Sequence, residues 1–285
     1  MKATGVARLT CAVTVNRVVR SQTTRGKPIV TAANLNQPAT KTPLHVFKEF
    51  EWLARIDPAF DQARRNLGRL VWTPDAPALA VKYREIIAAV ILGCRSYPSI
   101  EVHLRRAVAE GATLREVLEG FQTAAILGGF PALHYALPFM IALHDEFGDK
   151  ILGEPKRAAM AKKPKDDARP ATGAVSRGMR EWAWLDSIDP AFEGAHQDLT
   201  ALVWTPAVPA LPVKIRELVA SAVLAYRAFP TLDGHLRRAV REGASVREAV
   251  EAMEVAALPG GFPVIHYALP FLNAIHDEVE AGTFR

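Results

Sequence analysis

Cysteine is scarce in this chain of 285 residues, which contains only Cys11 and Cys94. Two cysteines cannot build the disulfide framework of a small secreted domain, and within one chain they cannot supply an all-cysteine zinc site. The cysteine content therefore favours a protein of the reducing cytoplasm.

Long hydrophobic runs are also missing. Even the apolar run from Ile86 to Gly93 ends before Arg95, which makes it far shorter than the roughly 18 to 20 residues of a membrane-spanning helix. We therefore expect no membrane partner.

Acidic side chains are absent before Glu49, whereas the same stretch contains eight Lys and Arg residues. Residues 150–180 add nine basic and three acidic residues, so these two segments carry +14 in a chain whose net charge is +5. The rest of the chain is then net about −9. Since the basic residues lie outside the candidate folded parts, no positive groove for phosphates is indicated, and we expect no nucleic-acid partner.

The chain contains an internal repeat. A shift of 132 positions lays residues 52–146 over residues 184–278 without a gap, and about half of the aligned residues are identical. The shared segments are IDPAF, LVWTP, HLRRAV, GGFP, HYALPF and HDE. A match of this length indicates one structural unit that is used twice.

The repeat predicts four segments. Residues 1–43 form a mobile basic tail, residues 44–149 the first unit, residues 150–177 a basic linker rich in Lys, Ala, Pro and Gly, and residues 178–285 the second unit. Such a linker is long enough for the two units to pack about a pseudo-two-fold axis, as the subunits of a homodimer do. We therefore expect a fused dimer.

Each unit has helical periodicity without strand alternation, which predicts an all-α fold. In the first unit we expect helices at residues 44–55, 58–71, 78–94, 98–110, 113–127 and 130–147. Thr113 with Glu116 matches a capping box, in which a hydroxyl and a carboxylate bind free amides at the start of a helix. Pro138 should kink or break the last helix, and Pro270 should do the same in the second unit.

Glu85 is the most informative candidate residue. Its neighbours at helical spacing, Val81, Ala88, Ala89 and Leu92, are all apolar. A carboxylate on an apolar face must find a hydrogen-bonding partner or hold its proton, and such a group is a typical general acid or base. Glu217 repeats this pattern in the second unit.

Histidines on the following helix are the expected partners. His103 and His235 each lie among apolar neighbours, and a short turn near residues 96–98 joins the first of these helices to the helix of Glu85. We therefore expect His103 to contact Glu85 and His235 to contact Glu217, so that each pair can shuttle a proton. The alternative is a buried polar contact that only fastens two helices. Retention of both pairs in copies that differ at about half their positions favours the functional interpretation.

Four more residues are candidates. His134 and His266 follow the Gly-Gly-Phe-Pro turns, so we expect them to point toward the interior of the unit or toward the contact between units. Arg106 and Arg238 follow the paired histidines by three residues and are candidates for binding a substrate carboxylate. The alternative for these arginines is a solvated helix face.

Metal-site motifs are missing. The sequence has no HExxH motif, no two histidines at i and i+4, and no cysteine pair. The matched histidines leave a Glu-His-His site open, but we predict no metal. The Trp-Thr-Pro steps at residues 72–74 and 204–206 indicate packing where a helix stops.

Residues 84–120 read REIIAAVILGCRSYPSIEVHLRRAVAEGATLREVLEG and residues 128–137 read GGFPALHYAL, with a counterpart at residues 216–269. The order of Glu, His, Gly-Ala-Thr/Ser-x-Arg-Glu and Gly-Gly-x-Pro resembles the carboxymuconolactone decarboxylase and alkylhydroperoxidase D family. The resemblance implies tandem all-helical domains that assemble into rings, so that a fused pair would form a homotrimer. It also implies one of two activities: cofactor-free decarboxylation of a lactone acid, or thiol peroxidase chemistry.

The peroxidase activity in that family uses a Cys-x-x-Cys motif four residues before the histidine. The corresponding positions here are Ser99 and Ser96 in the first unit and Thr231 and Ala228 in the second. Cys94 lies two residues earlier and lacks a resolving partner. Peroxide reduction through Cys94 is therefore the disfavoured alternative.

The residue types match the decarboxylase activity instead. Loss of carbon dioxide next to an unsaturated lactone leaves an enolate-like charge, which needs hydrogen-bond donors and a proton source. The two Glu–His pairs would supply the proton, with His134 and His266 as helpers. The resemblance thus implies a cofactor-independent lyase or isomerase acting on a small carboxylated compound derived from ring cleavage. A non-catalytic ligand-binding or assembly protein is the alternative from another class.

Overall fold

The computed structural model describes residues 48–153, 180–206 and 209–285, and all of the regular structure in these ranges is helical. The first half contains α2 (Lys48–Ile56), α3 (Pro58–Trp72), α4 (Val81–Cys94), α5 (Ile100–Ala109), α6 (Leu114–Gly128), α7 (Pro131–Phe147) and the short 3-10 helix η2 (Asp149–Ile151). The second half contains α9 (Arg180–Ile188), α10 (Pro190–Trp204), α11 (Val213–Tyr226), α12 (Leu232–Arg241), α13 (Val246–Gly260) and α14 (Pro263–Glu280). The all-α fold expected from the sequence is thus confirmed.

The expected tail at residues 1–43 lies outside the described residues, as does the expected linker from residue 154 onward. The first residues of that linker contribute to η2. In the described ranges, every helix is too short or too polar to cross a lipid bilayer.

Local side-chain chemistry fixes where α6 and α13 begin and end. The capping box expected between Thr113 and Glu116 is present, and Ser245 and Glu248 form the equivalent box at the start of α13. In the first box, the Thr113 amide donates to Glu116 Oε2 at 2.8 Å. Gly129 ends α6 with a φ of 100°, a left-handed conformation that glycine adopts at little cost.

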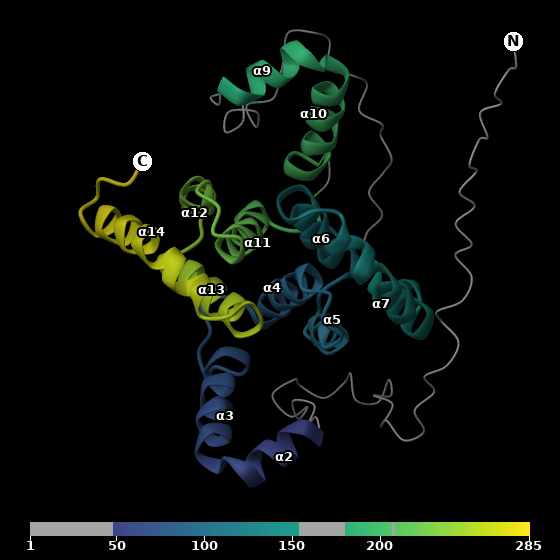
Figure 1. Cartoon of the computed structure of the whole chain (residues 1–285), viewed down its shortest axis with the longest axis vertical. Coiled ribbons are helices and arrows are strands. Elements are labelled where there is room, and N and C mark those ends of the chain that lie inside the picture. Colours follow the sequence, from purple (N-terminus) through teal and green to yellow (C-terminus); the bar gives the residue numbers. More distant parts are fainter. Residues whose placement is uncertain (1–47, 154–179, 207–208) are drawn as a thin grey trace, which may run out of the picture.

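Two helices, α4 and α11, form the centre of the molecule (Figure 1). Residues 84–93 of α4 and residues 215–225 of α11 are buried on every side, which is typical of a helix enclosed by others. Helices α13 and α6 cross between the halves, because α13 packs on α4 and α6 packs on α11. Most of the buried apolar side chains of both halves belong to one continuous core, so the two units fold against each other.

Two pairs of consecutive helices, each pair joined at a steep angle, extend from this centre at opposite ends (Figure 1). We call α2 and α3 the first arm, and α9 and α10 the second arm. Large apolar side chains are exposed on both arms, at equivalent positions of the repeat.

The start of α4 differs from the expected one, and of the two outcomes expected at Pro138 the structure excludes a break. Helix α4 begins at Val81 rather than at residue 78, because the Ala78 and Leu79 amides donate to the carboxylate of Glu251 instead of entering the helix. Pro138 does not break α7, since the helix continues through it to Phe147. Pro270 likewise lies inside α14.

We predict that Gly93→Ala lowers the free energy of unfolding by about 1 to 3 kcal/mol, because the added methyl group overpacks a filled core. A Cβ atom at Gly93 would lie 2.6 Å from Cε1 of the buried Phe121 ring and 3.3 Å from the Ala132 carbonyl oxygen. Urea denaturation followed by circular dichroism measures the change.

The matched control is Gly194→Ala on α10, where a Cβ atom would meet no other atom within 4 Å. This variant should be neutral or more stable by up to about 1 kcal/mol, because alanine favours the helix. Equal destabilisation by the two substitutions would contradict the packing described around Gly93.

Candidate active site

Glu85 and His103 meet inside the first half. The Glu85 side chain is fully buried on α4, and the His103 side chain on α5 is 11% exposed. His103 Nδ1 lies 2.7 Å from Glu85 Oε2, so the contact expected from the sequence is present. The intervening turn includes Ser96 with a φ of 50°, a conformation uncommon for a residue other than glycine.

Glu217 and His235 repeat this geometry in the second half. His235 Nδ1 also lies 2.7 Å from Glu217 Oε2, and the intervening turn contains Ala228 with a φ of 49°. The chain therefore contains two carboxylate–imidazole dyads, which we call the first dyad (Glu85 and His103) and the second dyad (Glu217 and His235).

The Glu contact fixes the roles of the two imidazole nitrogens. A carboxylate oxygen accepts the hydrogen bond, so we assign the shared proton to Nδ1 of each histidine. Nε2 is then the ring nitrogen left to exchange a proton with a bound molecule. Within the described residues, no hydrogen bond reaches Nε2 of His103 or His235. Each dyad can therefore hold a proton on one side and move one on the other.

Arginines complete both dyads. Arg106 Nη1 lies 3.0 Å from Glu85 Oε1, and Arg238 Nε lies 3.1 Å from Glu217 Oε1. These are ion-pair distances, but the atoms are not aligned for hydrogen bonds, and Oε1 of each glutamate makes none with the described protein atoms. Each buried carboxylate thus keeps one oxygen with unused acceptor capacity beside a guanidinium group.

This placement changes what is expected of the two arginines. Both guanidinium groups face the dyad carboxylate, rather than being held apart for a substrate carboxylate. Arg106 is 7% exposed, and its Nη2 donates a hydrogen bond to the Trp72 carbonyl oxygen at 3.3 Å. Arg238 is 29% exposed, so it retains more free surface for a ligand.

Tryptophan rings cover the histidines, a feature that was not recognised in the sequence. Trp72, the last residue of α3, has its ring centroid 4.7 Å from that of His103. Trp204 lies 5.2 Å from His235 in the same way. Their signal was the Leu-Val-Trp-Thr-Pro segment kept in both copies, which we had interpreted only as packing at a helix stop.

His134 and His266 do not have the expected orientation. Both side chains are exposed in the described chain, whereas we expected them to point toward the interior of the unit or toward the contact between units. The inward side of α7 is taken by Ala132, Ala136, Met140 and Leu143, which leaves His134 on the opposite side. His134 has the Phe130 ring as a neighbour, at a centroid distance of 6.2 Å.

Cys94 is poorly suited to thiol chemistry. Burial raises the pKa of its thiol to about 11, although the nearby charge of Arg227 acts in the opposite direction. The thiolate is the reactive form, so little of it exists at neutral pH. Cys11 lies outside the described residues. In the ranges that the structure covers, no three His, Cys, Asp or Glu side chains are grouped so as to hold a metal ion.

Comparison with known proteins decides the family. The model of the carboxymuconolactone decarboxylase family matches this chain twice, at residues 58–142 and 190–274. The chain belongs to the carboxymuconolactone decarboxylase family. Both dyads lie within the matched segments, one in each, and so the tandem duplication expected from the sequence is a duplication of the family domain.

A solved structure shares the fold of this family member. It is a chain from Burkholderia xenovorans, provisionally assigned as a gamma-carboxymuconolactone decarboxylase subunit, with 24% sequence identity and a TM-score of 0.52. The similarity covers 83% of the present chain and 92% of the other chain. No curated protein matches the sequence.

We predict that Cys94 titrates with a midpoint near the pKa of about 11 that burial gives it. In a Cys11→Ser background, ultraviolet absorbance of the thiolate should rise only in strongly alkaline solution. The free cysteine of a short unstructured peptide is the reference. A midpoint below that of the peptide would contradict the burial of this thiol and would revive the peroxidase alternative.

Proposed function

We propose that this chain is a cofactor-independent lyase or isomerase that acts on a small carboxylated compound of the ring-cleavage type by Glu/His acid–base chemistry. The observation that carries the proposal is a buried carboxylate oxygen 2.7 Å from an imidazole nitrogen in each half. Membership of the carboxymuconolactone decarboxylase family supports the reaction class.

The proposed step is decarboxylation with proton delivery by histidine. The bond between the substrate carbon and its carboxylate breaks, and the electron pair moves into the conjugated carbonyl system to give an enolate and carbon dioxide. The protonated imidazole of His103 then donates its Nε2 proton to the enolate, and solvent restores that proton. Glu85 holds Nδ1 and stabilises the imidazolium form, the role of the acid in other carboxylate–histidine pairs.

The charge of the site suits a carboxylate. The Glu85 carboxylate and the Arg106 guanidinium compensate each other at 3.0 Å, so protonation of His103 leaves the site with one net positive charge. One positive charge attracts a carboxylate and stabilises a developing enolate. The same count holds for Glu217, Arg238 and His235, where the greater exposure of Arg238 makes it the better candidate for direct contact with the substrate carboxylate.

Isosteric variants of the glutamates test this proposal. We expect Glu85→Gln or Glu217→Gln alone to remove only the contribution of its own dyad, whereas the double variant should lose about 100-fold or more of the turnover of carboxymuconolactone-type acids. Turnover is followed by carbon dioxide release. The control is Glu101→Gln, which alters an exposed glutamate of α5 that pairs with Arg105. If the double variant keeps full turnover, the acid–base role of the two glutamates is wrong. If the wild-type protein binds such acids without consuming them, it is a non-catalytic binding protein.

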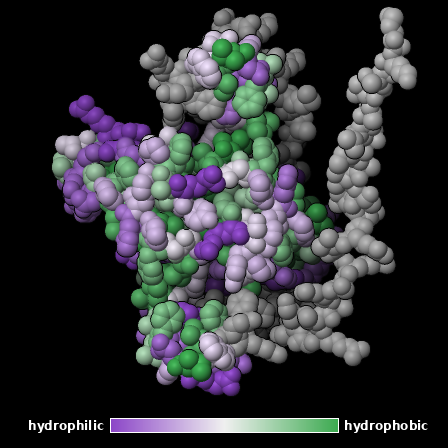
Figure 2. All heavy atoms as spheres, in the orientation of Figure 1, coloured by the Kyte–Doolittle hydropathy of each residue, from purple (hydrophilic) through white to green (hydrophobic). Residues whose placement is uncertain are grey.

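We also propose that the chain self-associates, as a homotrimer of fused units located in the cytoplasm. The support is apolar surface on both arms, visible at the two ends of the molecule in Figure 2. Eight side chains there are between 55% and 69% exposed, at four equivalent positions: Trp52 and Trp184, Ile56 and Ile188, Phe60 and Phe192, Leu70 and Leu202. Exposed apolar groups of this size and number are typical of protein interfaces.

The arms differ in charge, which favours contact between unlike arms of neighbouring copies. Residues 48–72 contain five basic and four acidic residues, whereas residues 180–204 contain one basic and five acidic residues. A first arm that meets the second arm of the next copy makes a head-to-tail contact, and such contacts close into a ring when the rotation allows.

Light scattering after size exclusion tests the association. The wild-type protein should have about three times the chain mass of 31.1 kDa. Substitution of both Leu70→Glu and Leu202→Glu should reduce the mass to that of one chain, because burial of two charges in the apolar contact is unfavourable. Ile141→Glu is the control, since this residue is 57% exposed on α7, outside the arms. A monomeric wild type would reject the proposal.

A further inference from the structure

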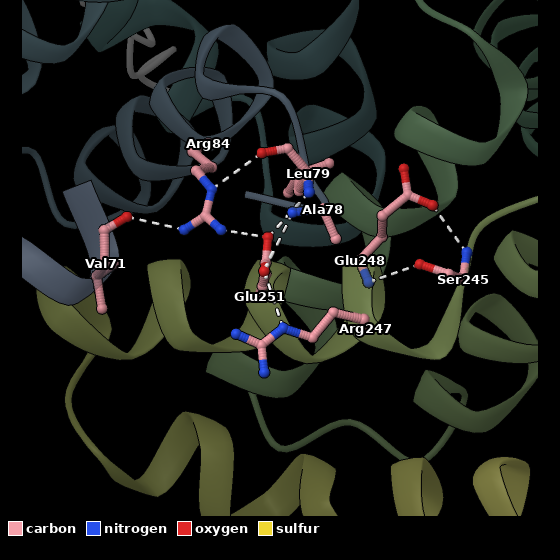
Figure 3. Close-up of polar contacts among 8 residues, drawn as sticks. All are labelled: Val71, Ala78, Leu79, Arg84, Ser245, Arg247, Glu248 and Glu251. Carbon is pink, nitrogen blue, oxygen red and sulfur yellow. Dashed lines mark hydrogen bonds and ion pairs between the residues drawn. The ribbon is translucent and has the colours of Figure 1, made fainter. Parts of the chain in front are cut away.

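A buried ion pair that joins the two halves is not used by the proposed chemistry. Arg84 on α4 and Glu251 on α13 contact each other through Arg84 Nη2 and Glu251 Oε2, and each side chain is only 1% exposed. Figure 3 shows the Glu251 carboxylate between the Arg84 guanidinium and the backbone that leads into α4. A buried ion pair is weak support for stability as such, because removing two charges from water is costly. Its geometry indicates a positioning role instead.

Glu251 binds the backbone that precedes α4. Its carboxylate accepts hydrogen bonds from the Leu79 amide at 2.8 Å and the Ala78 amide at 3.2 Å, and Arg247 adds a third at 2.9 Å. Burial raises the pKa of Glu251, but these hydrogen bonds and the charge of Arg84 outweigh burial and hold the pKa below its ordinary value of 4.5. At neutral pH the carboxylate is thus a permanent acceptor.

Arg84 connects Glu251 to the first dyad in two ways. Its Nη1 donates to the Val71 carbonyl oxygen at 2.8 Å (Figure 3). The next residue, Trp72, has its ring centroid 4.7 Å from that of His103. Along α4, Arg84 immediately precedes Glu85. Through Arg84, Glu251 of the second half is therefore connected to two parts of the site in the first half. These are Trp72, which lies beside His103, and Glu85.

The opposite contact is also present. Glu119 on α6 of the first half accepts hydrogen bonds from the Leu211 amide at 2.9 Å and from Arg216 Nη2 at 3.1 Å. Arg216 precedes Glu217 and lies 3.5 Å from the Trp204 carbonyl oxygen through its Nη1 atom. Each half thus contributes a glutamate to the backbone before the central helix of the other half, at equivalent positions of the repeat.

We propose that Glu251 is a positioning residue for the first dyad and Glu119 a positioning residue for the second, so that each half orders the site of the other. The catalytic meaning of this crossed arrangement rests on the proposed function, but the positioning itself concerns only the contact between glutamate and histidine. Mutation of residues that orient metal ligands through a second contact typically changes activity by about 10- to 100-fold, and we expect an effect of this order here.

Nuclear magnetic resonance of the imidazole protons in the full chain tests the positioning without any substrate. Glu251→Gln keeps the shape of the side chain, but its amide has only one acceptor oxygen and cannot accept from the Ala78 and Leu79 amides, Arg84 and Arg247 together. It should speed exchange of the His103 Nδ1 proton with water by about tenfold and leave His235 unchanged. Glu119→Gln should do the reverse. Resonances are assigned with His103→Gln and His235→Gln.

The matched control is Glu248→Gln. Glu248 lies on α13, one turn before Glu251, but its partners Lys214 and Ser245 belong to its own half. It should leave exchange at His103 unchanged. If Glu251→Gln does not fold, Glu251→Asp retains the charge and should give a smaller effect at the same histidine. Equal acceleration at both histidines, or acceleration at neither, would overturn the proposal.

Activity then separates this inference from the proposed function. In a Glu217→Gln background only the first dyad remains, and Glu251→Gln should lower kcat about tenfold, with little change in KM, because it disturbs the dyad rather than substrate contacts. Crossed exchange effects together with full turnover in the variant lacking both dyad glutamates would reject the acid–base function and leave the positioning intact. Crossed exchange effects without the loss of kcat would overturn the catalytic part of this inference.

Discussion

A carboxylate on a helix that is buried on every side is the constraint on which this structure depends. Glu85 lies in the buried part of α4, where an isolated charge would be strongly unfavourable. On the next helix, His103 contacts one oxygen of this carboxylate and Arg106 contacts the other. Trp72 lies against the His103 ring. The elements around α4 are therefore arranged around one acidic side chain, and α11 repeats the arrangement around Glu217.

Duplication within one chain has kept the two sites alike and allowed their surroundings to differ. The distance between carboxylate and imidazole is 2.7 Å in both halves. The arginines differ, because Arg106 is almost enclosed whereas Arg238 is partly exposed. Position 94 differs as well, since Cys94 in the first half corresponds to Tyr226 in the second. Such differences permit unequal use of the two sites while the proton-holding contact is retained.

The two halves do not behave as separate domains joined by a tether. They share most of one core, and each sends a buried glutamate to the backbone that precedes the central helix of the other. Reciprocal contacts of this kind are those that a two-fold relation between equivalent units produces. Separation of the halves would leave buried amides and a buried arginine without partners, so folding of the two family domains is coupled.

The sequence by itself determined the helices, the duplication and the meeting of Glu85 with His103. These features depend on periodicity, on capping residues and on a short turn between consecutive helices, all of which are local.

Tertiary structure alone decided the rest. Ala78 and Leu79 leave the helical pattern because a carboxylate 173 and 172 positions away accepts their amides. Arg106 faces Glu85, and His134 faces outward, because packing between helices selects which side of each helix is enclosed. Periodicity shows that a helix has an apolar side, but the partners of its polar groups come from distant segments that only the folded chain brings together.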